Sequence, residues 1–203
     1  MGLQVHRFFG RGVEEPYFPE AAMEIERAIG EAKMIVITHE HGDHIAGAIR
    51  SPFFAEIAPK TVLTRAQAVT LLTNPQMPEI KLEPDQARCF IVVDYDKYFP
   101  VAPGMALVAA PGHTPGSQMV YVVLQSGKEY LLAGDVAWHM DGVLQIAGKD
   151  APWVNEPAAT MMAQLTWLNA VMNNEPNVAI VISHDEEQRL DHIAQGLLAD
   201  GFR

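Results

Sequence analysis

Three histidines and one aspartate fall within six residues of the chain, in the segment HEHGDH at 39–44. An apolar run typical of a buried strand comes directly before it. Because side chains alternate along an extended chain, His39 and His41 can turn toward one ion. Asp43 and His44 can then turn toward a second. Imidazole and carboxylate ligands suit zinc, and also iron or manganese, so the segment predicts a site for two metals.

Three more side chains of the same chemistry follow apolar, strand-like runs elsewhere in the chain. They are His113 in PGHTPGS at 111–117, Asp135 after YLLAG at 130–134, and His184 in ISHD at 182–185. A carboxylate at the end of a strand can bridge two cations through its two oxygens. The single cysteine, Cys89, excludes a thiolate cage.

The order of these motifs resembles the metallo-β-lactamase superfamily: HxHxDH, then a histidine in PGHTPGS, then GD, then a histidine after a last strand. The resemblance covers the chain from about Pro19 to the C-terminus and includes all seven ligand positions. It implies that His39, His41 and His113 bind a first metal. It implies that Asp43, His44 and His184 bind a second metal, and that Asp135 bridges the two. The implied cofactors are two divalent ions, zinc before iron or manganese.

The same resemblance implies an α/β (or α+β) fold, a four-layer αββα sandwich in a single domain of residues 1–203. Helical periodicity predicts helices at 19–30, 45–49, 65–72, 157–172 and 186–198. Apolar runs predict strands at 34–38, 60–63, 90–93, 105–109, 118–124, 129–132 and 178–182. The early strands alternate with helices in a βαβα order, whereas the four strands from 90 to 132 are predicted to form an antiparallel meander. Met161, Leu165, Leu168 and Met172 are predicted to be core.

Only 38 residues precede His39, where members of this family usually carry two or three strands. We therefore expect a shortened first sheet, with residues 3–9 supplying one strand. A short, exposed sheet edge invites pairing with another copy, so we expect a homodimer or a chain that starts inside a longer protein.

Charge and hydropathy exclude several classes of partner. The formal net charge is −11, from 14 Lys+Arg against 25 Asp+Glu, and no dense basic cluster occurs, so a nucleic-acid partner is not expected. No run approaches the roughly 20 apolar residues of a membrane span, and the N-terminus lacks the apolar core of a signal peptide. We expect no membrane contact, a cytoplasmic location and a small-molecule substrate.

The resemblance implies hydrolysis of an ester or lactone carbonyl by a metal-bridging hydroxide, because divalent cations lower the pKa of bound water to about 7. Asp43 is the predicted catalytic side chain and would carry a proton to the leaving group. Four residues are candidates to orient the imidazoles, although each suits a turn or cap equally well: Thr38, Thr114, Ser117 and Asp185. Trp138 and His139 are expected near the substrate, or alternatively as a buried indole and an exposed imidazole.

Other side chains are less informative. Four tyrosines could each offer a phenol to a reaction intermediate: Tyr95, Tyr98, Tyr121 and Tyr130. His6 and His192 are expected on the surface. Glu40 is predicted to point away from the metals, because side chains alternate along a strand.

Several residues favour some reactions of this superfamily over others. His41 stands where diiron flavoproteins carry a carboxylate, and Asp135 counts against true β-lactamases, which usually lack it. The segment SHDEEQ at 183–188 is similar to lactonases that open N-acyl-homoserine lactones. A lactone or ester hydrolase is therefore the first expectation. The alternatives are a glyoxalase-II-like thioester hydrolase, a mononuclear iron persulfide dioxygenase, or a metal-binding domain with little activity.

Overall fold

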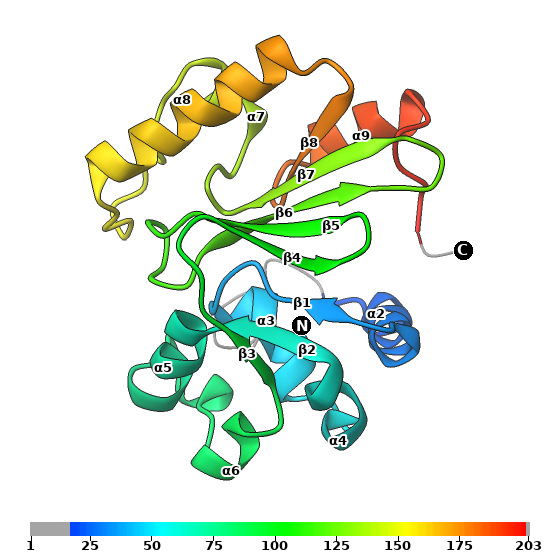
Figure 1. Ribbon diagram of the computed structural model, residues 1–203, viewed down its shortest axis with the longest axis vertical. Helices are drawn as coiled ribbons and strands as arrows, with labels where there is room; N and C mark the ends of the chain where they lie inside the picture. The colour runs from blue at the N-terminus through cyan, green and yellow to red at the C-terminus, as the bar shows by residue number, and fades with distance from the viewer. Residues whose placement is uncertain (1–16, 202–203) are drawn as a thin grey trace. The chain divides into compact units, whose positions relative to one another are not determined.

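The computed structural model describes residues 17–201, which divide into two compact units (Figure 1). The first unit ends at Asp94 and the second spans Tyr95–Gly201. The strand predicted at residues 3–9 lies outside the described residues, and the single-domain organisation stays a prediction. Within the described range, no helix combines the length and hydrophobicity that a bilayer crossing needs.

The first unit is built on a parallel sheet in the order β1-β2-β3. Its strands are β1 (Ile35–Val36), β2 (Thr61–Thr64) and β3 (Ile91–Val93). Its helices are α2 (Pro19–Glu31), α3 (Gly42–Ile49), α4 (Phe54–Ile57), α5 (Arg65–Thr73) and α6 (Pro84–Ala87), with 3-10 turns η1 (Ala58–Lys60) and η2 (Pro78–Ile80). Parallel neighbours need a crossover between them, and helices supply it here, which confirms the predicted βαβα order.

Two local predictions for this unit are wrong. β3 was assigned to an antiparallel meander, yet it pairs parallel with β2, with Val62 opposite Ile91. An apolar run indicates a strand but carries no information about its partner, and the helices between β2 and β3 bring the chain back in the same direction. Helix α2 also continues through Gly30 to Glu31.

The core of the first unit holds the strand that leads into the histidine loop. Ile45, Leu63 and Leu71 are fully buried in this core. Gln67 completes a capping box with Thr64 at the start of α5, and its side-chain amide donates to the Ile37 carbonyl at 3.0 Å. This buried hydrogen bond fixes the chain two residues before the first candidate ligand.

The second unit is a five-stranded sheet in the order β4-β5-β6-β7-β8. Its strands are β4 (Tyr98–Ala102), β5 (Met105–Ala109), β6 (Gln118–Val123), β7 (Glu129–Gly134) and β8 (Val178–Ile182). Pairing is antiparallel from β4 to β7, and β8 joins parallel to β7. The sequence pattern missed β4 because Pro100 interrupts it, and an edge strand tolerates proline.

Three helices accompany this sheet: α7 (Met140–Leu144), α8 (Ala158–Asn174) and α9 (Glu186–Ala194). Helix α8 packs Met161, Leu165 and Leu168 into a core shared with the sheet, as predicted, and Figure 1 shows it lying along the sheet. Met172 packs against the edge of this core. Helix α9 begins at Glu186, as predicted, but it stops at Ala194, four residues before its predicted end.

Candidate metal centre

The candidate ligands of the first unit lie on the loop after β1 and in the first turn of α3. His41 is the N-cap residue directly before α3, and its carbonyl accepts the N–H groups of His44 and Ile45, each at 3.0 Å. The N–H of Gly42 donates to the side chain of Gln76 at 2.9 Å. The helix start therefore fixes the spacing between the four side chains.

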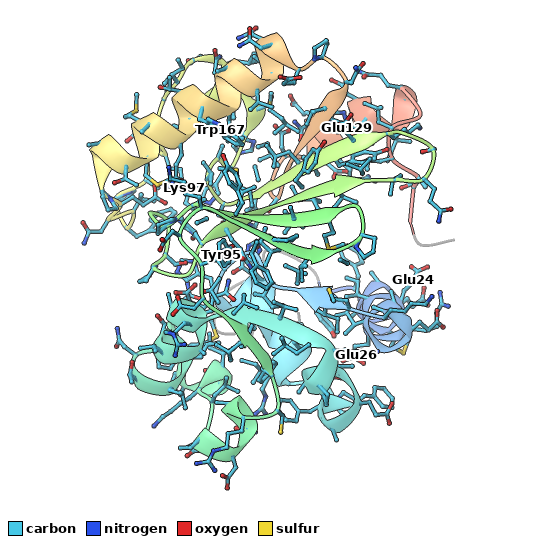
Figure 2. All side chains as sticks on the ribbon, viewed as in Figure 1. Glu24, Glu26, Tyr95, Lys97, Glu129 and Trp167 are labelled. Atoms are coloured by element: carbon cyan, nitrogen blue, oxygen red, sulfur yellow. The ribbon has the colours of Figure 1, made fainter. Side chains whose placement is uncertain are left out.

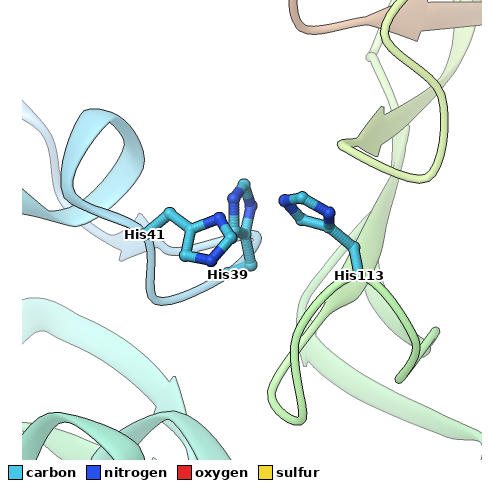
Figure 3. A group of neighbouring side chains, drawn as sticks. All are labelled: His39, His41 and His113. Atoms are coloured by element: carbon cyan, nitrogen blue, oxygen red, sulfur yellow. The ribbon is translucent and has the colours of Figure 1, made fainter. Parts of the chain in front are cut away.

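These four side chains crowd together within the unit. The ring centroids of His39 and His41 are 4.9 Å apart, and Figure 3 shows the two rings beside each other. The rings of His39 and His44 are 3.9 Å apart, and the Nε2 atom of His44 lies 3.5 Å from the Oδ2 atom of Asp43. His39 is buried, with 1% of its surface exposed.

Thr38 lies where it can orient two of these imidazoles. Its hydroxyl oxygen is 3.3 Å from Nδ1 of His39 and 3.4 Å from Nδ1 of His44. A hydroxyl oxygen has two lone pairs and can accept from both Nδ1–H groups. That choice of tautomer leaves each Nε2 as a ligand atom.

The candidate ligands of the second unit come from three loops, which follow β5, β7 and β8. The Oδ2 atom of Asp135 lies 3.5 Å from Nε2 of His113 and 3.2 Å from Nε2 of His184. The side chain of Asp135 is 5% exposed, whereas that of His184 is 39% exposed. One carboxylate oxygen thus faces two imidazole nitrogens, so these three side chains bring candidate metal donors together within the second unit.

Lys149 and Glu156 form a buried ion pair beside His113, which the sequence analysis did not predict. The Oε1 atom of Glu156 lies 2.5 Å from Nδ1 of His113 and 2.5 Å from Nζ of Lys149. Lys149 also donates to the Asp135 carbonyl. A lysine and a glutamate in a polar, irregular stretch give no sequence signal that separates them from surface residues.

The remaining residues named for the site have structural partners. Thr114 donates its N–H to the Ser117 hydroxyl at 2.9 Å, and the two hydroxyl groups are 2.8 Å apart, so both shape the His113 turn. Asp185 caps α9 by accepting from the Gln188 N–H, and it also accepts from the Met140 N–H at 2.6 Å.

Trp138 and His139 separate in the structure. The Trp138 indole donates to Oδ2 of Asp135 at 3.0 Å, which places it against a candidate ligand. His139 is exposed and is the N-cap residue directly before α7. His192 was predicted on the surface, but it is half-buried, with Nε2 at 3.0 Å from the Ile180 carbonyl. Glu40 is buried, with 2% exposed.

The structure shows the surroundings of the four candidate tyrosines. Tyr95 donates to the Gln118 side chain at 2.5 Å, Tyr121 donates to Glu129, and Tyr130 donates to the Leu197 carbonyl at 2.6 Å. Tyr98 is 64% exposed. Three of the phenols are thus engaged within the second unit.

Burial and charge set the protonation of the second half-site. Burial, followed by the nearby Lys149 ammonium, lowers the pKa of His113 and favours the neutral imidazole that a metal needs. Burial likewise lowers the pKa of Lys149, against the opposing effect of Glu156. Burial alone would raise the pKa of Asp185, but backbone N–H donors from Gln188 and Met140 bring it below its ordinary value.

The candidate donor atoms of each unit are of the types that bind divalent metals. Three imidazoles have Nδ1 close to an oxygen acceptor: His39 and His44 beside Thr38, and His113 beside Glu156. Their Nε2 atoms therefore suit metal coordination, and the carboxylates of Asp43 and Asp135 supply the negative charge that divalent ions require. In the described chain, the candidate donors are nitrogen and oxygen atoms, as zinc, iron and manganese accept.

A cavity of about 570 Å³ lies elsewhere in the second unit, beside α8 and the start of β4. Lys97 and Trp167, labelled in Figure 2, are among its lining residues. None of the residues that line it is a candidate ligand, but Gln164 in its wall donates to the Pro111 carbonyl of the His113 loop at 2.9 Å.

Comparisons with solved structures identify the fold. An N-acyl homoserine lactone hydrolase with its product bound at the catalytic metal centre superposes with a TM-score of 0.60 at 20% identity, over 80% of this chain and 60% of that one. A dizinc quorum-quenching lactonase gives 0.57 at 13% identity, over 81% and 62%. A hydrolase of the β-lactamase superfamily gives 0.55 at 16% identity, over 79% and 59%.

This chain therefore has the metallo-β-lactamase fold, as predicted, with helices and two sheets. It spans about 60% of the length of these solved structures. A comparison with protein-family models gives no match, and a comparison with curated protein sequences gives none.

Proposed function

We propose that the chain is a dinuclear metal-dependent hydrolase that opens an ester or lactone carbonyl. The observation that carries the proposal is the Asp135 carboxylate, whose Oδ2 atom faces the Nε2 atoms of both His113 and His184. With an imidazole on each side, this carboxylate could be shared by two cations, each of them also bound by one of the histidines.

The proposed ligands are the seven residues that the sequence predicts. The first unit offers His39, His41, Asp43 and His44, and the second unit offers His113, Asp135 and His184. Zinc is the proposed metal, because imidazole and carboxylate ligands without thiolates suit a catalytic zinc site.

The chemistry divides between the metals and the chain. Two bound cations would supply a water of lowered pKa and polarise the carbonyl. Thr38 and Glu156 hold imidazoles in one tautomer, and Trp138 holds the orientation of the Asp135 carboxylate through its indole N–H. Asp43, in the first turn of α3, would donate a proton to the oxygen atom of the leaving group.

Lactones are the proposed substrate class, because two of the compared structures are described as N-acyl homoserine lactone hydrolases or quorum-quenching lactonases. The resemblance of the SHDEEQ segment to N-acyl-homoserine lactonases also supports this. In that segment, Gln188 accepts from the Ile182 N–H at 2.9 Å and so ties the start of α9 to β8. A small-molecule substrate and a homodimer stay proposals, and so does the cytoplasmic location.

Metal analysis joined to an activity panel tests the proposal. Purified chain should contain about two zinc equivalents and turn over a lactone faster than a thioester, a phosphodiester or a β-lactam. His113→Ala should lose metal and activity together while the circular dichroism spectrum stays native. His192→Gln, which changes a histidine facing the Ile180 carbonyl, is the matched control.

Other results would overturn the proposal in identifiable ways. One bound iron with sulfur-dependent oxygen uptake would indicate a persulfide dioxygenase. Thioester turnover exceeding lactone turnover would indicate a glyoxalase-II-like enzyme. Two bound metals without turnover of any substrate would indicate a metal-binding domain.

A further inference from the structure

We infer that Lys149 and Glu156 are positioning residues for the metal ligands of the second unit. Glu156 sets the tautomer of His113, and Lys149 holds the backbone of the Asp135 turn. The inference rests on the proposed function, because it concerns how this chain prepares its metal ligands.

Burial separates this ion pair from ordinary surface pairs. The side chains of Lys149 and Glu156 are 4% and 8% exposed, whereas those of the Arg65–Asp94 pair are 66% and 64% exposed. Two buried charges cost solvation free energy, and a pair of this kind often stabilises a fold no better than apolar residues would. A role beyond stability explains why the pair is placed beside a ligand.

The contact with His113 decides the position of a proton. A carboxylate only accepts hydrogen bonds, so the Nδ1 atom of His113, 2.5 Å from Glu156, must carry the hydrogen. The Nε2 atom then keeps its lone pair and points at Asp135. This is the tautomer that coordinates a metal through Nε2.

Lys149 competes for the same nitrogen. Its Nζ atom lies 3.1 Å from Nδ1 of His113, and an ammonium that donated there would force the hydrogen onto Nε2. The shorter, charge-assisted contact with Glu156 prevents this. Without Glu156, Lys149 would become the dominant partner of Nδ1, and the imidazole would present an N–H to the metal.

Lys149 also anchors the second ligand. It donates to the Asp135 carbonyl and lies 5.3 Å from the ring centroid of Trp138, whose indole N–H donates to the Asp135 carboxylate. Lys149 is thus bound directly to the loop after β7 and, through Glu156 and His113, to the loop after β5. Because Glu156 neutralises it, it adds little net positive charge where a cation is to bind.

The segment that carries the pair is held in a costly conformation. Ile146, three residues before Lys149, has φ 49°, and a β-branched residue in this region is strained. The side chain of Ile146 packs against the core of the second unit. Strain of this kind persists only where surrounding structure determines it, so packing fixes the path of the chain toward Lys149.

The tautomer of His113 is the direct readout, and it needs no metal. In ¹⁵N spectra of the metal-free full chain, native His113 should carry its hydrogen on Nδ1, and Glu156→Ala should move it to Nε2. Zinc affinity, measured by competition with a chromophoric chelator, should fall about 10–100-fold. Asp94→Ala, which breaks the exposed Arg65–Asp94 pair, should change neither value.

A second pair of variants separates the two roles and guards against misfolding. Lys149→Met should keep the Nδ1–H tautomer yet weaken zinc binding about tenfold, because the Asp135 turn loses a donor. If Glu156→Ala unfolds, Lys149→Met with Glu156→Leu removes both charges, and such apolar replacements of a buried pair are usually tolerated. Zinc affinity should still fall about 10–100-fold in that folded double variant.

The outcomes distinguish this inference from the proposed function. A native chain that takes up neither Zn²⁺ nor Co²⁺ would overturn both. A native chain that binds two ions, with Glu156→Ala and Lys149→Met matching it in tautomer and affinity, would overturn the positioning role alone.

Discussion

The Nε2 atom of His184 lies 3.2 Å from the Oδ2 atom of Asp135. The two residues follow β7 and β8, which are parallel neighbours, with Gly134 opposite Ile182. Parallel strands bring their carboxyl ends to one edge of a sheet, so a residue just after each strand meets the other. A register shift between Leu132 and Gly134, with φ 56° at Gly134, turns Asp135 out of the ladder.

Asp135→Asn should release metal. The substitution keeps the size of the side chain but removes the charge that two cations would share, so we expect at least one of two zinc equivalents to be lost after dialysis. Elemental analysis measures this. Asp141→Asn, which changes an exposed aspartate in the first turn of α7, should retain both ions. Full metal content in Asp135→Asn would contradict the bridging role.

Asp185→Ala should destabilise the second unit by about 1–2 kcal/mol, because the cap of α9 is lost and the Met140 N–H loses its acceptor. Urea unfolding followed by circular dichroism measures the change. Asp185→Asn retains an acceptor oxygen and should cost about half as much or less. Equal losses in both variants would show that charge, rather than capping, dominates.

Tyr95 should ionise far above the ordinary range. Burial raises the pKa of its phenol to about 12, so its tyrosinate absorbance should appear only near that pH. The raised pKa means that the folded state holds the proton more tightly than the unfolded state, so this contribution to stability is complete below about pH 10 and declines as the pH rises toward 12. Spectrophotometric titration checks it against Tyr95→Phe. A difference spectrum that titrates near pH 10 would refute it.

Gly112→Ala and Gly30→Ala should act in opposite directions. A Cβ at Gly112 would lie 2.7 Å from Sδ of Met161, so the His113 loop or α8 must shift, at a cost of about 1–3 kcal/mol. A Cβ at Gly30 meets nothing within 4 Å, and alanine in helix α2 should stabilise by about 0.5–1 kcal/mol. Thermal unfolding of both variants measures the two signs. A neutral Gly112→Ala would show that Met161 yields without cost.

The candidate metal ligands could be proposed from the sequence because metal-binding chemistry depends on residue types at strand ends. Strands β5 and β8 were predicted with their observed bounds, since each is a continuous apolar run between turn residues. The partner of β3 was not predictable, because strand pairing depends on the direction in which a crossover returns the chain. Strand β4 was missed because its pattern is broken at Pro100, which only its place at the sheet edge allows.

The sequence by itself determined which side chains can bind metal, because imidazole and carboxylate groups carry that chemistry wherever they lie. Tertiary structure alone decided what surrounds them. Lys149 and Glu156 look like surface residues in the sequence, yet folding buries both beside His113. The reason is physical: ligand identity is a property of a residue, whereas its tautomer and orientation depend on neighbours that are distant along the chain.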